Sequence, residues 1–373
     1  MLPNTKPDLF FDSDGICAAC IAFDKRKTID WNAREEEFHK ILKSFKSGSR
    51  WDCIIPVSGG KDSTAQVLKI ISLGYNPLCV TATTCDLSDI GRKNLLNIRN
   101  LGVDHVEYSP NPVVRKSLNR LALQEIGDIS WPEHVGIFTI PIRASVDFGV
   151  PLIIWGENSQ NEYGGPASSQ ESKTLDRKWL EEFGGLLGLR VTDLVESYGF
   201  TPSELYMYQY PSDEELNNAQ TTGLFLGHFF PWDGLSNAIL STAYGFNSMT
   251  NQVEGSLVNY ENLDNYQTGI HDYFKYLKYG FSRTTDLTSV LIRRQLLSRR
   301  EGLQIVKNLD GNFPHTYLGK KLVDILGEIG ISISEFLLLC DKFTNASIFE
   351  KDEHNNMRRN HDGSPIKINY DNP

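Results

Sequence analysis

The sequence predicts an α/β fold in which a doubly wound, mostly parallel five-stranded sheet is followed by a helical C-terminal region. Three observations support this prediction. Short apolar runs alternate with helical periodicity from residue 51 onward, the first helical stretches stop at Gly74 and Gly102, and the pattern becomes mainly helical after about residue 236. Alternating strands and helices require parallel strands with right-handed crossovers. Such sheets bind ligands where the carboxyl ends of the strands meet.

The predicted strands are five apolar runs of suitable length for a buried sheet. They cover residues 53–57, 78–82, 103–108, 151–156 and 223–230. Helical patterning covers residues 30–45 before the sheet, and residues 63–73, 88–101, 113–126 and 140–148 between its strands. In the C-terminal region the best-defined helices are expected over residues 267–277, 287–297 and 318–327.

We divide the chain into three parts, in keeping with a length of 373 residues. Residues 1–50 form an N-terminal segment with a Cys-x-x-Cys pair and a helix, and residues 51–235 form the sheet domain. Residues 236–373 form a helical, substrate-binding region. Within the sheet domain, residues 161–221 are acidic and less periodic, so we expect a partly helical insertion there.

Composition excludes several classes of protein. With 40% hydrophobic residues the chain can bury a core, which argues against a collagen-like, coiled-coil or disordered protein. Its 47 acidic against 37 basic residues leave a net charge of −10, which disfavours a nucleic-acid partner. Six cysteines are too few for a disulfide scaffold, and no apolar run has the ~20 residues that cross a bilayer. We therefore expect a cytoplasmic enzyme without a membrane partner.

The most specific motif lies between the first predicted strand and its helix and reads Ser-Gly-Gly-Lys-Asp-Ser-Thr. Two glycines let the backbone N–H groups approach an anion, and the helix N-terminus adds partial positive charge. It is not the longer G-x-x-x-x-G-K-[ST] loop. The alternative is an ordinary glycine-containing turn with a capping side chain. The candidate nucleotide-binding residues are Ser58, Gly59, Gly60, Lys61, Ser63 and Thr64, together with Thr83 at the end of the second strand.

Polar residues also follow the fourth predicted strand. Glu157 and Asn158 come directly after it, and Glu162 and Tyr163 follow a few positions later. Carboxylate, amide and phenol groups at this end of the strand would face the cleft of a doubly wound sheet. The alternative is a glycine-rich turn whose carboxylates are simply solvated.

A third cluster lies in the C-terminal region, around Arg283, Asp286 and Arg293. Arginines next to Ser, Thr and Asp suit an anionic substrate such as a sugar nucleotide. The neighbouring Arg299 and Arg300 are explained as well by a solvated helix face. At the end of the fifth predicted strand, His228, Trp232 and Asp233 are further candidates for substrate binding, although a lone histidine is more often structural.

The cysteine pair Cys17 and Cys20 leaves two interpretations open. The spacing suits two ligands of a zinc ion, but a structural zinc site normally has four ligands. The pair is therefore either half of a Zn²⁺ site or two small core residues.

The glycine-rich motif resembles the PP-loop of the ATP-pyrophosphatase superfamily, which binds the leaving pyrophosphate of ATP. The resemblance implies attack of a substrate at the α-phosphorus. It also implies that Ser58, Gly59, Gly60 and Ser63 bind phosphate, and that Asp62 holds Mg²⁺ or caps the helix. Lys61 occupies a position that varies across the superfamily, and Thr83 would lie near the adenosine by analogy of fold.

The chain as a whole is similar to the bacterial N-acetyl sugar amidotransferases of surface-polysaccharide and nonulosonic-acid (pseudaminic or legionaminic acid) pathways. The similar segments are the Asp-Gly-x-Cys-x-x-Cys opening, the PP-loop, and residues 29–31, 156–158, 162–165, 230–233, 280–286 and 299–301. The resemblance implies that ATP and Mg²⁺ convert the acetamido group of an N-acetylated sugar to an acetamidino group through an O-adenylyl imidate. AMP and pyrophosphate would be released.

Ammonia for this reaction would come from a separate glutaminase with an ammonia-channelling subunit, because the chain has no glutaminase motif of its own. The candidate catalytic residues are Asp62, Glu157, Glu162, Arg283 and Asp286, and the candidate substrate-binding residues are Asn158, Tyr163, His228, Trp232, Asp233 and Arg293.

Two other functions compete with this one. PP-loop enzymes that thiolate tRNA or form lysidine also combine the loop with Cys-x-x-Cys pairs, but they need a basic face, and the net charge of −10 argues against it. A sensor that binds ATP without turnover would not need the carboxylates at the strand ends.

Overall fold

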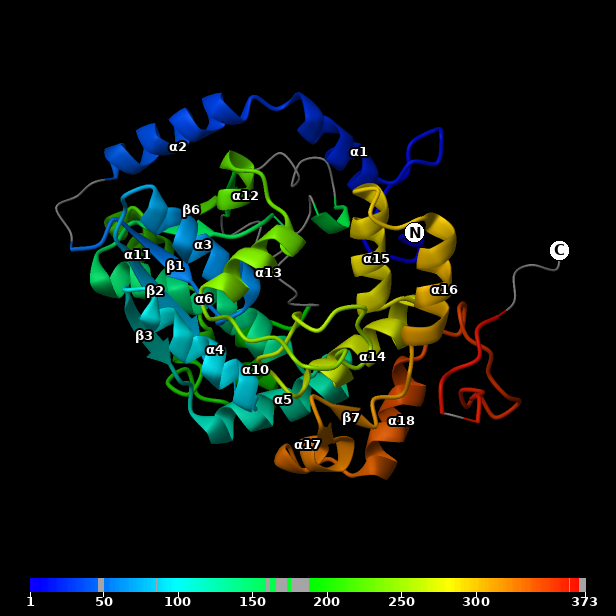
Figure 1. Ribbon diagram of the computed structural model, residues 1–373. Coiled ribbons are helices and arrows are strands. Elements are labelled where there is room, and N and C mark those ends of the chain that lie inside the picture. Colours follow the sequence, from blue (N-terminus) through cyan, green and yellow to red (C-terminus); the bar gives the residue numbers. More distant parts are fainter. Residues whose placement is uncertain are drawn as a thin grey trace.

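The computed structural model describes residues 1–45, 50–84, 86–158, 162–165, 173–175, 188–361 and 363–368. Its main sheet has six strands in the order β3-β2-β1-β4-β6-β5 (Figure 1). Five of them run parallel, which confirms the predicted fold class, and the short strand β5 (Thr174–Leu175) pairs antiparallel with β6 at the edge. The parallel strands are β1 (Cys53–Pro56), β2 (Pro77–Ala82), β3 (Asp104–Tyr108), β4 (Leu152–Trp155) and β6 (Thr222–Phe225).

Helices cover both faces of the sheet, as a doubly wound fold requires. Successive residues of β1 illustrate this, because Ile55 packs in a cluster with the helices α2 and α3 while Ile54 packs in a second cluster with α6. The helices next to the sheet include α3 (Lys61–Ser72), α4 (Asp89–Asn100), α5 (Pro112–Ile126), α6 (Trp131–Phe148) and α13 (Gly234–Ala243). The helix expected over residues 140–148 is thus only the second half of α6.

The fifth predicted strand is shorter than the apolar run suggests. β6 ends at Phe225, and the helical turn α12 (Leu226–Phe229) follows it, so that His228 is on a helix. The Gly227 N–H donates to the carbonyl of Gly156 at 3.1 Å, and the Phe230 N–H donates to that of Leu226 at 3.0 Å. The apolar run continues through this turn because Phe229 is fully buried, so hydrophobicity alone did not reveal where the strand ends.

The predicted insertion over residues 161–221 is partly helical where it is described. It contains β5, α10 (Val191–Tyr198), the short 3₁₀ helix η2 (Tyr206–Tyr208) and α11 (Asp213–Ala219). The rest of the prediction for this stretch falls on residues 161, 166–172 and 176–187, which lie outside the described residues.

The N-terminal segment contains α1 (Ala18–Lys25), the 3₁₀ helix η1 (Arg26–Thr28) and α2 (Trp31–Ser44). The Asp30 side chain caps α2 by accepting from the N–H of Ala33 at 3.1 Å. Figure 1 shows that α2 lies along the sheet domain, whereas α1 reaches α15 of the C-terminal region. This segment therefore spans both other parts of the chain.

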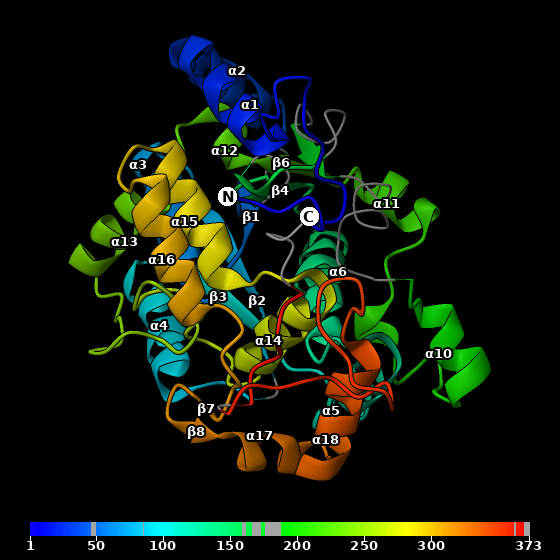
Figure 2. The same cartoon turned by 90° about the vertical axis from the view of Figure 1, so that its right-hand side faces the viewer.

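The C-terminal region is helical, as predicted, with a second core around the buried Phe274 and Phe336, which Leu123 and Ile129 of the sheet domain also join. Figure 2 views the molecule from the side of α15, α16 and α18, with the sheet behind them. The elements are α14 (Thr268–Tyr279), α15 (Arg283–Arg293), α16 (Arg299–Leu309), the hairpin of β7 (Thr316–Tyr317) and β8 (Lys320–Lys321), α17 (Leu322–Glu328) and α18 (Ile333–Phe343). Within the described part of the chain, none of the helices combines the length and the apolar character that a membrane span requires. The predicted division at residues 50 and 235 stays a prediction.

Candidate active site

The glycine-rich loop lies at the carboxyl end of β1 and leads directly into α3. Gly59 has a φ of +80°, and a Cβ atom there would lie 2.6 Å from the backbone nitrogen of Leu95. Glycine is therefore required both by the backbone conformation and by the close approach of α4. Gly60 is the N-cap of α3, and the Ser63 hydroxyl donates to its carbonyl at 3.1 Å. The hydroxyl oxygen of Thr64 is buried and has no hydrogen-bond partner among the described residues.

The side chain of Lys61 joins the loop to the C-terminal region. It is 4% exposed, and its Nζ pairs with the carboxylate of Asp62 and, at 2.7 Å, with Oε1 of Glu261. Burial opposes the charge, but the two carboxylates raise the pKa of Lys61 above its ordinary value. The other oxygen of Asp62, Oδ1, accepts from Asn237 at 2.8 Å. Lys61 is therefore held as a buried ammonium group between two carboxylates.

A first cavity of about 110 Å³ opens over this loop. Loop residues 58–63 form one side, and the rest is lined by Gly91 and Asn94 of α4 and by Phe246 and residues 260–264 of the C-terminal region. Every predicted phosphate-binding residue except Thr64 lines it. Backbone N–H groups of a glycine turn and a helix N-terminus are the groups that bind anions in such loops.

A second cavity of about 60 Å³ adjoins the first. Both are lined by Lys61, Asp62, Tyr260 and Glu261. The remaining polar or aromatic lining residues of the second cavity are Glu157, Glu162, Tyr163, Trp232 and Arg294. The structure thus brings the motif after β4 and the motif after β6 to the same place as the glycine-rich loop.

Among the residues that line the second cavity, Glu157 has a carboxyl whose shifted pKa bears on catalysis. Burial raises the pKa of its carboxyl to about 7, and the nearby negative charge of Asp62 acts in the same direction. Burial likewise raises the pKa of the Tyr163 phenol well above its usual range, with Glu261 adding to the effect. A carboxyl that titrates near neutral pH in a cavity is suited to proton transfer.

Glu162 lies in a network that connects all three parts of the chain. Its carboxylate pairs with Nη1 of Arg26 at 2.5 Å and with Nη2 of Arg294 at 3.7 Å. The same two arginines donate to the carbonyl oxygen of Trp232, at 3.0 Å and 3.2 Å. Arg294 also pairs with Asp233, which caps α13, and Arg293 donates to the carbonyl of Glu162.

Arg283 and Asp286 lie close to this region but do not line either cavity. The Arg283 guanidinium pairs with Asp272 at 3.2 Å, and Asp286 pairs with Lys275. Burial opposes the charge of Arg283, but Asp272, Glu261 and Asp286 raise its pKa above its ordinary value. Arg283 interacts electrostatically with Glu261, and the charges of Arg283 and Asp286 both act on the pKa of Tyr163. Glu261 and Tyr163 line the second cavity.

Among the other predicted site residues, Thr64, Thr83, Asn158, His228, Asp233 and Arg293 also do not line the two cavities. His228 lies under α2, where burial and then the charge of Arg34 lower its pKa to about 4. The Thr83 hydroxyl donates to the carbonyl of Tyr108 at 3.0 Å and to Ser109 at 2.9 Å. Asn158 is buried beside Glu162, whose N–H donates to its carbonyl at 3.4 Å.

The cysteine pair lies at the start of α1, where Sγ of Cys17 is 3.4 Å from Sγ of Cys20. The hydrogen bond between the two sulfur atoms lowers the pKa of Cys17 to about 5. In the described ranges, no His, Cys, Asp or Glu joins the two sulfur atoms to make a group of three metal ligands. Both interpretations of the pair stay open.

Sequence reasoning missed Arg26 and Glu261 and did not assign Arg294 to the site. Glu261 follows Tyr260 in a stretch without a recognisable motif, and only its ion pair with Lys61 reveals it. Arg26 is one of several cations in a charged segment, and its role depends on contacts with residues more than a hundred positions away. The sequence did contain a clue to Arg294, because this residue adjoins Arg293 in the predicted arginine cluster.

The fold and the site define an α/β protein with a glycine-rich loop at the carboxyl edge of a parallel sheet, completed by a helical C-terminal region. Residues 254–361 match the family model described as "LPS biosynthesis protein WbpG-like, C-terminal domain". Over that segment the match confirms the resemblance to proteins of surface-polysaccharide synthesis. The matched segment supplies Glu261, Arg283 and Arg294.

Among solved structures, the chain is similar to "Structure of NMN synthetase from Francisella tularensis", with 11% identity and a TM-score of 0.28. The similarity covers 60% of this chain and 99% of that chain. A likeness at this level adds nothing to the fold, which the strand order itself establishes. No curated protein matches the sequence.

Proposed function

We propose that this chain is an ATP-dependent amidotransferase that converts the acetamido group of an N-acetylated sugar to an acetamidino group. The observation that carries the proposal is the shared wall of the two cavities. Residues 58–63 line the first cavity, and Lys61 and Asp62 of the same loop also line the second, opposite Glu157. A nucleotide in the first cavity and a sugar in the second would meet at this wall. The WbpG-like segment supports a substrate from LPS synthesis.

In the first step, the acetamido oxygen attacks the α-phosphorus of ATP, and pyrophosphate leaves. The backbone N–H groups of Gly59 and Gly60 and the hydroxyl of Ser58 would bind the pyrophosphate oxygens. Lys61 would exchange one of its carboxylate partners for phosphate, because its ammonium group is already charged and lies at the cavity. Fixed donors of this kind stabilise charge that develops during the reaction.

The carboxylates at the shared wall fit Mg²⁺, which prefers oxygen ligands. Asp62 and Glu261 line both cavities, and the negative charge of Asp62 raises the pKa of nearby Glu157. Asp62 would hold the ion, with Glu261 as a second ligand. When bound, Mg²⁺ neutralises charge on the phosphate groups.

In the second step, ammonia attacks the carbon of the O-adenylyl imidate, and AMP leaves with the former acetamido oxygen. Glu157 would accept the proton that the attacking nitrogen loses, since its carboxyl titrates at about 7. Free ammonia is mostly protonated at neutral pH, so we propose that a partner glutaminase with an ammonia-channelling subunit delivers it. Arg283 and Asp286 would shape the charge around Tyr163 rather than touch the reacting atoms.

The decisive experiment follows the acetamido oxygen. Purified chain is incubated with ATP, Mg²⁺, an ammonium salt at high pH and candidate acetamido sugars whose acetamido group carries a heavy oxygen isotope. We expect a sugar product one mass unit lighter than the unlabelled substrate, because an NH group replaces an oxygen atom, and we expect the heavy oxygen in AMP. Pyrophosphate without labelled AMP, or ATP binding without pyrophosphate release, would contradict the proposal.

A further inference from the structure

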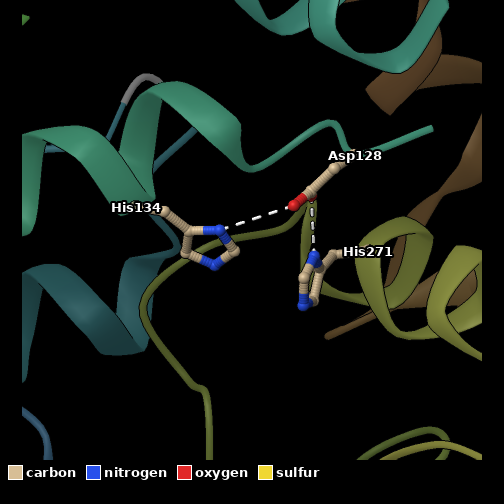
Figure 3. A group of neighbouring side chains, drawn as sticks. All are labelled: Asp128, His134 and His271. Carbon is tan, nitrogen blue, oxygen red and sulfur yellow. Dashed lines mark hydrogen bonds and ion pairs between the residues drawn. The ribbon is translucent and has the colours of Figure 1, made fainter. Parts of the chain in front are cut away.

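Two histidines and one aspartate meet outside the candidate active site. Figure 3 shows Asp128 with the rings of His134 and His271 on either side of it. Asp128 lies in the turn between α5 and α6, His134 in the first turn of α6, and His271 in the first turn of α14. The three side chains each offer a ligand atom within 4.8 Å of the others. Imidazole nitrogen and carboxylate oxygen are the ligands found in His₂-carboxylate zinc sites.

The carboxylate of Asp128 is fixed before any ion binds. Its Oδ1 accepts from the N–H of Ser130 at 2.9 Å and from Nδ1 of His271 at 2.8 Å. The other oxygen, Oδ2, lies 3.4 Å from Nδ1 of His134. That nitrogen is buried and forms no hydrogen bond with the described residues. Two ligands of a tetrahedral zinc ion, each at roughly 2.0–2.1 Å, lie about 3.3 Å apart. The separation of Oδ2 and Nδ1 therefore suits two ligands of one ion.

The charge of Asp128 also favours a cation. Its side chain is 4% exposed, and the ion pairs found for it in the described part of the chain are with the two histidines, which carry charge only when protonated. The ammonium group of Lys278 is close enough to act on Asp128 electrostatically but donates to the carbonyl of Ile126 at 3.2 Å. A buried carboxylate needs a positive partner, and a divalent cation would supply one at neutral pH.

We propose that Asp128, His134 and His271 form a site for a divalent transition-metal ion of the zinc class. The site would tie the start of α14, within the WbpG-like segment, to the turn between α5 and α6. Three protein ligands leave one position of a tetrahedral ion to water. The site is independent of the proposed amidotransferase reaction and differs from the cysteine pair at the start of α1.

The first test measures binding to the full chain after metal removal with a chelator. The chain is titrated with Co²⁺, followed by its visible absorption, and then with Zn²⁺ in competition with a chromophoric chelator. We expect one equivalent of metal at this site. X-ray absorption of the zinc-loaded chain should show nitrogen and oxygen ligands near 2.0–2.1 Å without a sulfur shell near ~2.3 Å.

Variants then test whether His134 and His271 are the residues that bind the metal. His134→Gln and His271→Gln are each expected to weaken Zn²⁺ binding at least about 100-fold, because even second-shell changes cost 10–100-fold. The matched control is His354→Gln, which changes an exposed histidine. A Cys17→Ser, Cys20→Ser double variant should keep the affinity of the parent chain. Circular dichroism checks that each variant is folded.

The proposal is overturned by any of three results. The first is a parent chain that binds no Co²⁺ or Zn²⁺ at micromolar concentration, which does not depend on any variant being folded. The second is a sulfur shell in the X-ray absorption of singly loaded protein. The third is unchanged affinity in a folded His134→Gln, His271→Gln double variant. None of these results depends on ATP or sugar turnover, so they leave the proposed function untouched.

Discussion

At the scale of single residues, the carboxyl of Glu157 is the group whose protonation bears most directly on the proposed chemistry. Burial raises its pKa to about 7, so the carboxylate form predominates only above that pH. If Glu157 accepts a proton during amidation, turnover falls as the pH drops below about 7 and the group becomes protonated.

The variant Glu157→Gln should therefore lose this limb of the pH profile and reduce kcat by about 10²–10⁴-fold, as expected for removal of a general base. The measurement is acetamidine formation between pH 5.5 and 8.5 at a constant concentration of free ammonia. Glu214→Gln, an exposed change on α11, is the control. A Glu157→Gln variant with normal kcat and an unchanged profile would remove Glu157 from the mechanism.

The loop residues give a second prediction at this scale. Ser58→Ala and Asp62→Ala should each abolish pyrophosphate release while the chain keeps its circular dichroism spectrum. Ser58 is exposed in the cavity, and in the described part of the chain the Asp62 carboxylate contacts Lys61 and Asn237 at the edge of that cavity. Glu261 remains as a partner of Lys61 in the Asp62 variant, so we expect both variants to stay folded. Ser72→Ala at the exposed end of the same helix should behave like the parent chain. Normal pyrophosphate release from both loop variants would contradict the phosphate-binding assignment.

At the scale of elements, the junction of β1, α3 and α4 depends on a glycine without a side chain. Gly59 and Gly102 have similar backbone angles, with φ of +80° and +84°, but only Gly59 has another element against it. An alanine at Gly102 meets no atom within 4 Å, whereas one at Gly59 would lie 2.6 Å from the backbone of α4.

We therefore expect Gly102→Ala to lower the free energy of unfolding by about 1 kcal/mol, the cost of a left-handed backbone for an L-residue. Gly59→Ala should lower it by about 3 kcal/mol or more, because α4 must also move. Urea unfolding of the two variants measures the difference. Equal losses would mean that the close approach of α4 has no energetic weight.

The elements also show what the sequence could and could not predict. Strands β1, β2, β4 and β6 were predictable because each is an apolar run, and Cys53, Ile54 and Ile55 of β1 are fully buried. The half-buried β3 alternates polar and apolar residues and was recognised by its place between two helical stretches. The end of β6 was not predictable, because apolar residues continue into α12. The turn there is set by the hydrogen bond between Gly227 and Gly156. The glycine-rich loop was recognisable because its residues are contiguous. Glu261 and Arg26 were not recognisable, since they reach the site only through tertiary contacts.

At the scale of the whole molecule, buried polar contacts join the sheet domain to the C-terminal region. Lys61 pairs with Glu261, and the Ser241 hydroxyl donates to the Lys61 carbonyl at 2.6 Å. Asn94 of α4 donates to the carbonyl of Asn247 at 2.9 Å. A buried ammonium group separated from its carboxylate is strongly destabilising, so neither part is expected to stay folded when the other opens.

We accordingly expect a single cooperative heat-denaturation transition, with a calorimetric enthalpy equal to the van't Hoff enthalpy. Lys61→Met, which removes the buried charge from this contact, provides the comparison. Because the contacts of Ser241 and Asn94 also join the two parts, the variant should shift the common transition rather than split it. Two separate transitions in the parent chain would instead mean that the predicted boundary at residue 235 divides independently stable units.

The contact of Arg26 with the carbonyl of Trp232 joins atoms 206 residues apart in the sequence. A ribosome that adds about 5–20 residues per second takes about 10–40 s to synthesise that length, so η1, which carries Arg26, and the adjoining α1 leave the exit tunnel long before Trp232 exists. The buried residues of α1 are three alanines, which present little apolar surface to chaperones or to other nascent chains during that wait. Glu162 gains its second arginine only after residue 294 has been added, and Lys61 gains Glu261 only slightly earlier. A nascent chain that ends before residue 294 therefore carries the loop without all of the residues that complete its cavities, and the site can form only after that residue has been added.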